Sequence, residues 1–240
     1  MIHTAVNGVM FDFSGTLLRI EPVEEWLDAV LASGGGPRGG PARGTAAFDD
    51  LVRRLTRYGA QPGGPDPVRV PDDLVGLWDE RDLTPEGHRA VYTALTREAG
   101  LGDPELVEAL YERHMSPAAW RPYPDTAATL RALRGRGVPV AVVSNIGWDL
   151  RPVFRAHGLD ALVDAYVLSY EVGAQKPDAA IFRAACTLLG RAPAEVLMVG
   201  DSRTADGGAR ALGCPVHFVD PLPVDRRPSA LAPVLELTGR

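Results

Sequence analysis

Residues 6–20, with the sequence VNGVMFDFSGTLLRI, decide the fold. The apolar run from Val9 to Phe11 is short and continuous, which is typical of a strand buried on both faces of a parallel sheet. Asp12 follows directly, at the carboxyl end of the strand, which is where parallel sheets place their functional residues. Gly15 lets backbone approach a ligand closely, and Thr16 offers a hydroxyl that can donate to an anion. The stretch predicts a buried strand ending at a reactive Asp12, with a plain helix N-cap as the alternative.

Composition limits the class of protein. The chain has 240 residues, 45% hydrophobic and 23% charged, which suits one large globular domain or a main domain with a smaller one. Its formal net charge of -6 argues against nucleic acid as a partner and favours a small soluble substrate. No run approaches the roughly 20 apolar residues of a membrane span, and no basic segment precedes an apolar one at the N-terminus. We therefore expect a cytoplasmic protein without a membrane partner, either a monomer or a homodimer.

Lysine and cysteine are both rare in this chain. Lys176 is the one lysine among 25 basic residues. Because an ammonium and a guanidinium are not interchangeable in a tight site, Lys176 is a candidate functional residue, although an accidental surface lysine is the alternative. Cys186 and Cys214 lack the spacing of a metal site. We interpret them as buried thiols rather than as a disulfide or a redox pair.

Residues 20–121 show helical spacing of apolar residues, interrupted by two segments rich in glycine and proline. The predicted helices are 21–32, 46–58, 72–80, 84–99 and 103–114, and the two interruptions are 33–44 and 59–71. The pattern predicts an all-helical domain over residues 20–121. The segment 33–44 is predicted to be mobile, either as a lid or as disorder without function.

From residue 122 onward, helices alternate with short apolar strands. The predicted strands are 138–143, 165–168, 196–199 and 216–219, and the predicted helices are 125–135, 150–157, 178–189 and 204–212. Such alternation predicts an α/β fold, a parallel sheet with helices on both faces. This core would comprise residues 1–19 and 122–240, with a loop and a short helix as its tail.

Residues that can carry chemistry follow four of the predicted strands. They are Asp12 after the first strand, Ser144 and Asn145 after the second, Lys176 after the third, and Asp201 with Asp206 after the fourth. Carboxylate oxygens are the hard ligands that Mg²⁺ takes, and a hydroxyl and an ammonium can hold phosphate oxygens. Any one acid could be a helix cap. Their joint position at one edge of a parallel sheet predicts a site that handles phosphate and metal.

Four motifs resemble, in order and spacing, those of the haloacid dehalogenase (HAD) superfamily of hydrolases. They are DFSGTL at 12–17, SN at 144–145, KPD at 176–178 and GDSRTAD at 200–206. The resemblance covers essentially the whole chain. It implies a Rossmann-like core with a helical cap domain of the first type inserted between the first two motifs.

The resemblance also implies roles for particular residues. Asp12 would be the nucleophile that forms a covalent aspartyl intermediate. Mg²⁺ would be held by Asp12, the backbone carbonyl of Ser14 and Asp201, with Asp206 in support. Phosphate binding is implied for Ser14, Gly15, Thr16, Ser144, Asn145 and Lys176, and Ser144 and Lys176 are also candidate catalytic residues.

Ser14 departs from the pattern of similar phosphatases, which usually carry a second aspartate at this position as general acid and base. A serine hydroxyl is far too weak an acid to replace it, and general acid-base catalysis contributes roughly 10² to 10⁴ in rate. The sequence therefore predicts a phosphatase of a small phosphorylated metabolite that turns over alkyl phosphates slowly. Acyl and aryl phosphates need the missing acid least.

Three other functions stay open at this point. A 2-haloacid dehalogenase of this superfamily also uses an aspartate nucleophile, but it usually has tyrosine at the position of Ser14 and lacks the acid pair of Asp201 and Asp206. A phosphonate-cleaving relative would need a cap lysine, which this chain lacks because Lys176 is its only lysine. A binding or regulatory protein with weakened catalysis is the third alternative.

Four aromatic or imidazole side chains are further candidates. His88, His114 and His157 lie in helical patterns without an obvious partner and are interpreted as packing or surface residues. Trp148 follows the second motif closely. It is interpreted as a packing residue rather than as part of a pocket mouth.

Overall fold

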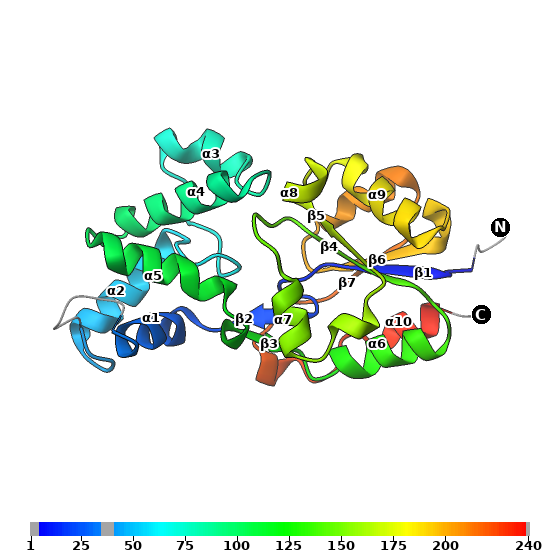
Figure 1. The fold of residues 1–240 in the computed structure, drawn as a ribbon, viewed down its shortest axis with the longest axis horizontal. Helices are drawn as coiled ribbons and strands as arrows, with labels where there is room; N and C mark the ends of the chain where they lie inside the picture. The colour runs from blue at the N-terminus through cyan, green and yellow to red at the C-terminus, as the bar shows by residue number, and fades with distance from the viewer. Residues whose placement is uncertain (1–4, 35–40, 239–240) are drawn as a thin grey trace. The chain divides into compact units, whose positions relative to one another are not determined.

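The computed structural model describes residues 5–34 and 41–238 (Figure 1). Part of the predicted mobile segment, residues 35–40, lies outside the described residues. The chain divides into two compact units, one formed by Met1–Arg19 with Arg121–Arg240 and the other by Ile20–Trp120. No helix in the described ranges is long and apolar enough to cross a membrane.

A parallel sheet forms the centre of the first unit. Its strands are β1 (Gly8–Phe11), β4 (Val140–Ser144), β5 (Ala165–Leu168), β6 (Val196–Gly200) and β7 (Val216–Phe218), in the spatial order β5-β4-β1-β6-β7. β1 is central, with Val9 opposite Val140 on one side and Leu197 on the other. All four residues of β1 are buried, as expected for a strand covered on both faces.

Helices cover both faces of this sheet (Figure 1). They are α6 (Thr126–Gly135), α7 (Arg151–Ala156), α8 (Ser169–Val172), α9 (Ala179–Leu189) and α10 (Ala232–Leu237). Alternation along the strands sends Met10 and Met198 into the same cluster as Ile181 and Phe182 of α9. The α/β fold predicted from the sequence is confirmed. Cys186 and Cys214 are free, buried thiols, also as predicted.

The structure differs from the sequence prediction at two core elements. Residues 204–212 were predicted as a helix, but Asp206–Leu212 form a 3₁₀ helix, η5. Two consecutive glycines weaken a regular helix here, and a Cβ at Gly208 would lie 2.6 Å from the Pro177 carbonyl oxygen. The short helix α8 was missed, because four residues are too few to show a helical period.

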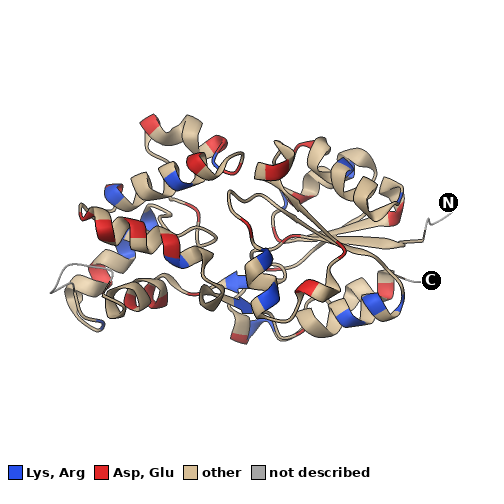
Figure 2. Ribbon diagram, in the orientation of Figure 1, with Lys and Arg blue, Asp and Glu red and all other residues tan. Residues whose placement is uncertain are grey.

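The second unit, Ile20–Trp120, is helical. It contains α1 (Val23–Ala32), α2 (Ala46–Arg57), α3 (Val75–Asp79), α4 (Pro85–Glu98) and α5 (Pro104–Met115). Their apolar faces form one core that includes Trp26, Phe48 and Leu110. The predicted helix 72–80 is a 3₁₀ turn followed by α3. Figure 2 shows acidic and basic residues interspersed over the helices of both units, the pattern of solvated faces.

The chain passes between the two units through two short strands. β2 (Leu18–Ile20) and β3 (Trp120–Pro122) pair as a two-stranded sheet. Neither strand was predicted, because three residues give no readable alternation. Just beyond β2, the Glu21 carboxylate is buried and accepts two hydrogen bonds from Arg113, each 2.7 Å long. This bidentate pair fixes the first residues of the helical unit onto α5.

Candidate active site

Asp12 lies at the carboxyl end of the central strand. Its backbone amide donates to the Val199 carbonyl of β6 at 2.9 Å, which continues the sheet one residue beyond β1. The residue is only 7% exposed. The parallel sheet thus delivers a single carboxylate to the edge where β4 and β6 also end.

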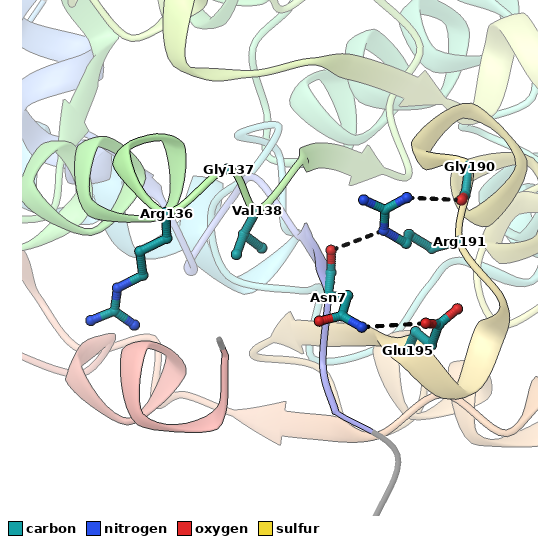
Figure 3. Close-up of a pocket in the computed structure, with 7 residues that line it drawn as sticks. All are labelled: Asn7, Arg136, Gly137, Val138, Gly190, Arg191 and Glu195. Atoms are coloured by element: carbon teal, nitrogen blue, oxygen red, sulfur yellow. Dashed lines mark hydrogen bonds between the residues drawn. The ribbon is translucent and has the colours of Figure 1, made fainter. Parts of the chain in front are cut away.

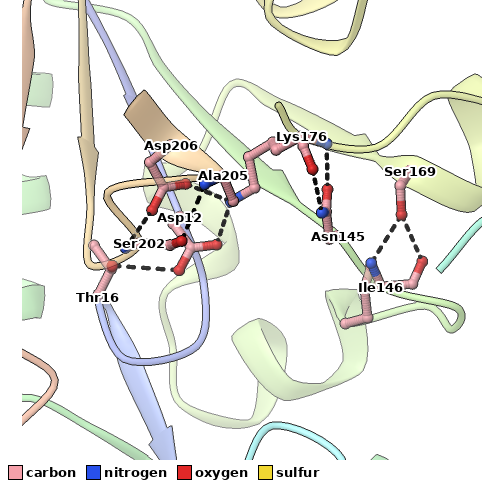
Figure 4. A network of polar contacts seen from close by, with 9 residues as sticks. All are labelled: Asp12, Thr16, Asn145, Ile146, Ser169, Lys176, Ser202, Ala205 and Asp206. Atoms are coloured by element: carbon pink, nitrogen blue, oxygen red, sulfur yellow. Dashed lines mark hydrogen bonds and ion pairs between the residues drawn. The ribbon is translucent and has the colours of Figure 1, made fainter. Parts of the chain in front are cut away.

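Lys176 bridges two carboxylates (Figure 4). Its Nζ lies 2.6 Å from Asp12 Oδ1 and 2.7 Å from Asp206 Oδ1, and the residue is 5% exposed. Burial acts to lower the pKa of Lys176, but the two carboxylates outweigh it and hold the pKa above its usual value. The one lysine of the chain is therefore a buried ammonium between two acids.

Asn145 fixes the backbone of Lys176. Its Nδ2 donates to the Lys176 carbonyl at 2.9 Å, and its Oδ1 accepts from the Lys176 amide at 2.6 Å. The next residue, Ile146, exchanges hydrogen bonds with the Ser169 hydroxyl of α8 through both its amide and its carbonyl. The side chain of Asn145, predicted to bind phosphate, is thus used here to position the lysine.

Asp206 is completely buried and held on both oxygens. Oδ1 accepts from Lys176, and Oδ2 accepts from the backbone amide of Ser202 at 2.9 Å. A Cβ at position 200 would lie 2.1 Å from Asp206 Oδ2, so only Gly200 lets the strand end pass this carboxylate. Asp206 therefore acts as a fixed acceptor that holds both the lysine and the turn after β6.

Three carboxylates converge at this edge of the sheet. Oxygens of Asp12, Asp201 and Asp206 lie within 4.8 Å of one another. Burial, only partly offset by Lys176, raises the pKa of Asp12 to about 7, and burial together with the charge of Asp206 raises the pKa of Asp201 to about 6. Three acids facing one ammonium leave negative charge uncompensated. The site is therefore chemically suited to a hard divalent cation such as Mg²⁺.

The turn after β1 approaches the acids through its backbone. Gly15 has φ +82°, and a Cβ there would lie 2.4 Å from Asp201 Oδ2, so both conformation and space require glycine. The Thr16 hydroxyl donates to Asp12 Oδ2 at 3.3 Å. Ser14 is half-buried in the same turn, and Ser144 is buried at the end of β4.

Two more residues lie around the turn after β1: Trp148, which was named from the sequence, and Arg227, which was not. Trp148 is buried and packs edge-on to Phe13 with ring centroids 6.3 Å apart, which is the packing role predicted for it. Arg227, which the sequence analysis missed, donates to the Gly15 carbonyl at 2.7 Å. It lies in a proline-rich tail where no spacing or motif marks it.

A separate hollow of about 300 Å³ lies at the opposite end of the strands (Figure 3). Asn7, just before β1, and Glu195, just before β6, line it and are hydrogen bonded to each other at 3.3 Å. Arg191 donates to the Asn7 carbonyl at 3.2 Å. The polar groups of this hollow largely satisfy one another's hydrogen bonds. The uncompensated negative charge lies instead with Asp12, Asp201 and Asp206, at the carboxyl ends of the strands.

Comparison with known proteins agrees with this fold. A family model described as haloacid dehalogenase-like hydrolase matches residues 6–213. The chain therefore belongs to the haloacid dehalogenase-like hydrolases and is an enzyme of the hydrolase class.

Two curated proteins and one solved structure are similar to this chain. The chain is 37% identical over 230 residues to phosphoserine phosphatase of Thermus thermophilus, covering 88% of both chains. It is 37% identical over 134 residues to haloacid dehalogenase-like hydrolase domain-containing protein 3 of Bos taurus, covering 53% of both, so the match spans about half the length of that relative. The structure of L-2-haloacid dehalogenase from Xanthobacter autotrophicus shares the fold, with a TM-score of 0.63 and 21% identity over 97% of this chain and 86% of that one.

Proposed function

We propose that this hydrolase is a Mg²⁺-dependent phosphatase that acts on a small phosphorylated metabolite. The observation that carries the proposal is the joint environment of Asp12, a buried carboxylate hydrogen bonded to Lys176 and lying within reach of two further acids. Similarity to a phosphoserine phosphatase over most of both chains supports the same reaction class.

The proposed reaction begins at Asp12. One of its carboxylate oxygens attacks phosphorus, the bond from phosphorus to the leaving oxygen breaks, and the phosphoryl group becomes covalently attached to Asp12. Water then hydrolyses this acyl phosphate and restores the carboxylate. Lys176 holds Oδ1 in a fixed direction, and Thr16 holds Oδ2, so the nucleophile is oriented before substrate binds.

The substrate oxygens require positive charge and hydrogen-bond donors. The Lys176 ammonium offsets part of the charge on the transferring group, and the Ser144 hydroxyl is a candidate donor to it. The single hydroxyl hydrogen of Thr16 points to Asp12 before substrate binds and would have to turn to the phosphoryl group to donate to it. Asp12, Asp201 and the carbonyl of Ser14 would hold Mg²⁺, while Asp206 keeps Lys176 in place. When bound, Mg²⁺ supplies Lewis-acid stabilisation of the phosphoryl oxygens.

The helical unit is proposed to be a cap domain. The chain enters the helical unit through β2 and leaves it through β3. These two paired strands are therefore the two covalent connections between the helical unit and the first unit. Exclusion of bulk water and choice of substrate would be the tasks of such a cap. A cytoplasmic location fits a phosphorylated metabolite as substrate.

Leaving-group chemistry is set by Ser14 in this proposal. An alkoxide leaving group needs a proton, and the serine hydroxyl is too weak an acid to give one. Acyl and aryl phosphates release stabilised anions. We therefore expect turnover to be faster for those substrates than for sugar phosphates.

A second candidate function follows from the same residue. A halide leaving group needs no proton, so Ser14 is compatible with 2-haloacid dehalogenation by Asp12. The carboxylates of Asp201 and Asp206 weigh against it, because they add negative charge where an anionic haloacid would bind. Chloride release from 2-chloropropionate tests this alternative directly.

The deciding experiment is phosphate release from acetyl phosphate, 4-nitrophenyl phosphate and glucose 6-phosphate, with Mg²⁺ or with EDTA. Wild type should release phosphate in a metal-dependent way, and Asp12→Asn should abolish release. Asp225→Asn, a change at an exposed aspartate, is the matched control and should leave release unchanged.

The variant Ser14→Asp locates the proton-transfer step. It should raise turnover of glucose 6-phosphate by roughly 10² to 10⁴ and change acetyl phosphate turnover little. Equal turnover of the sugar phosphate by wild type and Ser14→Asp would contradict the role given to Ser14. Absence of release from all substrates by both proteins would contradict the phosphatase proposal itself.

A further inference from the structure

The tail of the chain inserts a buried guanidinium beneath the nucleophile turn. Arg227 follows the 3₁₀ turn Val224–Arg226 and is 4% exposed. Its Nη1 donates to the Gly15 carbonyl at 2.7 Å, and its Nη2 donates to the Thr16 carbonyl. One planar side chain therefore holds two consecutive peptide oxygens of the turn that follows Asp12.

Arg227 is itself held in place by its neighbours. Its guanidinium lies over the Tyr123 ring, 3.1 Å from the ring centroid, and Nη1 also reaches the Asp220 carbonyl at 3.4 Å. The Tyr123 hydroxyl in turn donates to the Leu222 carbonyl at 2.8 Å. Stacking on Tyr123 and the backbone acceptors thus fix both the plane and the direction of the Arg227 guanidinium group.

The peptide oxygens that Arg227 holds belong to the segment closest to the acids. Gly15 has a positive φ and no room for a Cβ beside Asp201, and Thr16 donates to the nucleophile Asp12. The next carbonyl, of Leu17, is held by other groups of the same unit, the Thr126 hydroxyl at 2.7 Å and the Tyr123 amide at 3.1 Å. A rotation of the peptides at residues 15 and 16 would move the Thr16 hydroxyl away from Asp12.

We propose that Arg227 is the positioning residue that sets the nucleophile turn for phosphoryl transfer; this inference rests on the proposed function. It acts through the backbone of Gly15 and Thr16 rather than by touching substrate.

Arginine is required at this position by geometry. Two consecutive carbonyls need donors spaced as in a planar fork, and a guanidinium offers five N–H groups in that arrangement. A lysine ammonium is a point donor on a flexible stem. We therefore expect Arg227→Lys to keep the positive charge but to lose the two hydrogen bonds that position the Gly15 and Thr16 carbonyls.

The test compares Arg227→Met and Arg227→Lys with Arg226→Met, the same change at the exposed neighbouring arginine. Assayed with 4-nitrophenyl phosphate well below the unfolding temperature, both Arg227 variants should lose about 100-fold in kcat, the cost of misplacing a reacting group by roughly 1 Å, with KM nearly unchanged. Arg226→Met should behave as wild type. Wild-type kcat in folded Arg227→Met would overturn the proposal.

Two further measurements separate positioning from mere stability. Guanidinium ion at millimolar concentration should restore part of the kcat of Arg227→Ala, whereas ammonium at equal ionic strength should not. Backbone amides of residues 13–18 should exchange with deuterium faster in Arg227→Met than in Arg226→Met. Equal exchange in the two variants would contradict the proposal, and this measurement decides it even if the wild-type protein releases no phosphate.

Discussion

Acidification from pH 8 to pH 5 is expected to destabilise the helical unit through two buried histidines. His88 is 3% exposed and His114 fully buried, and their rings lie 5.3 Å apart. Both imidazoles contact the same tyrosine, since His88 Nδ1 lies 2.9 Å from the Tyr111 hydroxyl and His114 Nδ1 contacts the Tyr111 carbonyl. These histidines were predicted to be packing or surface residues without an obvious partner; both are buried in the helical unit with Tyr111 as a partner, and His88 Nε2 also lies 3.9 Å from the buried Asp82 carboxylate.

The sign of the effect follows from their pKa values. Burial lowers the pKa of His114 to about 3, and burial and the charges of His114 and Arg81 lower the pKa of His88 well below its usual value. Between pH 6.5 and 3 these two histidines bind more protons in the unfolded helical unit than in the folded one, so their contribution to its stability falls as the pH falls. At pH 5 the contribution of His114 alone is a loss of about 2 kcal/mol relative to pH 8, and His88 adds a loss of the same sign.

Urea unfolding between pH 5 and pH 8 measures this loss. Trp148 is the one tryptophan outside residues 20–120, so the Trp148→Phe background restricts the fluorescence signal to the helical unit. His114→Phe should lose about 2 kcal/mol less on acidification than the parent. Leu110→Ala, on the same helix, should lower stability by roughly 2 to 5 kcal/mol at every pH and keep the parental pH dependence. A parental pH dependence in His114→Phe would refute the reasoning.

Three further predictions concern the acid cluster. Gly15→Ala, which combines φ +82° with a Cβ 2.4 Å from Asp201 Oδ2, should lower kcat at least 100-fold, measured with an aryl phosphate; unchanged kcat would contradict the turn geometry. Lys176→Met should lower the free energy of unfolding in denaturant by roughly 3 to 5 kcal/mol, because Asp12 and Asp206 lose their shared cation. A decrease under about 1 kcal/mol would show that the ion pairs of Lys176 with Asp12 and Asp206 are not buried in solution. Mg²⁺ at 100 times its Kd should stabilise the wild type by about 3 kcal/mol in thermal unfolding, and equal stabilisation of Asp201→Asn would place the ion elsewhere.

The sequence was most informative where chain direction alone determines position. Carboxyl ends of parallel strands meet at one edge, so Asp12, Lys176 and Asp206 could be grouped although up to 194 positions separate them. The structure places these three within hydrogen-bonding distance of one another through the lysine. The parallel sheet itself was predictable because buried strands of this kind are short and continuously apolar.

Roles that depend on side-chain direction could not be predicted. Asn145 follows a strand as a phosphate ligand would, yet its amide is used on the backbone of Lys176. Arg227 sits in a tail without periodicity, and only the folded chain shows that it reaches Gly15. A carbonyl acceptor leaves no signature in the amino-acid sequence, so residues that act through backbone escape a motif-based analysis.

The central place of β1 has a consequence for how the protein is synthesised. Val9 leaves the ribosome before its partners Val140 and Leu197, which follow more than a hundred residues later. At 5 to 20 residues per second, Leu197 emerges roughly 10 to 40 s after Val9. Until then the nascent chain carries an apolar strand with unpaired edges, a template for aggregation. Because Arg227 is made later still, the Gly15 and Thr16 carbonyls gain their hydrogen bonds from its guanidinium only after Leu197 has been made.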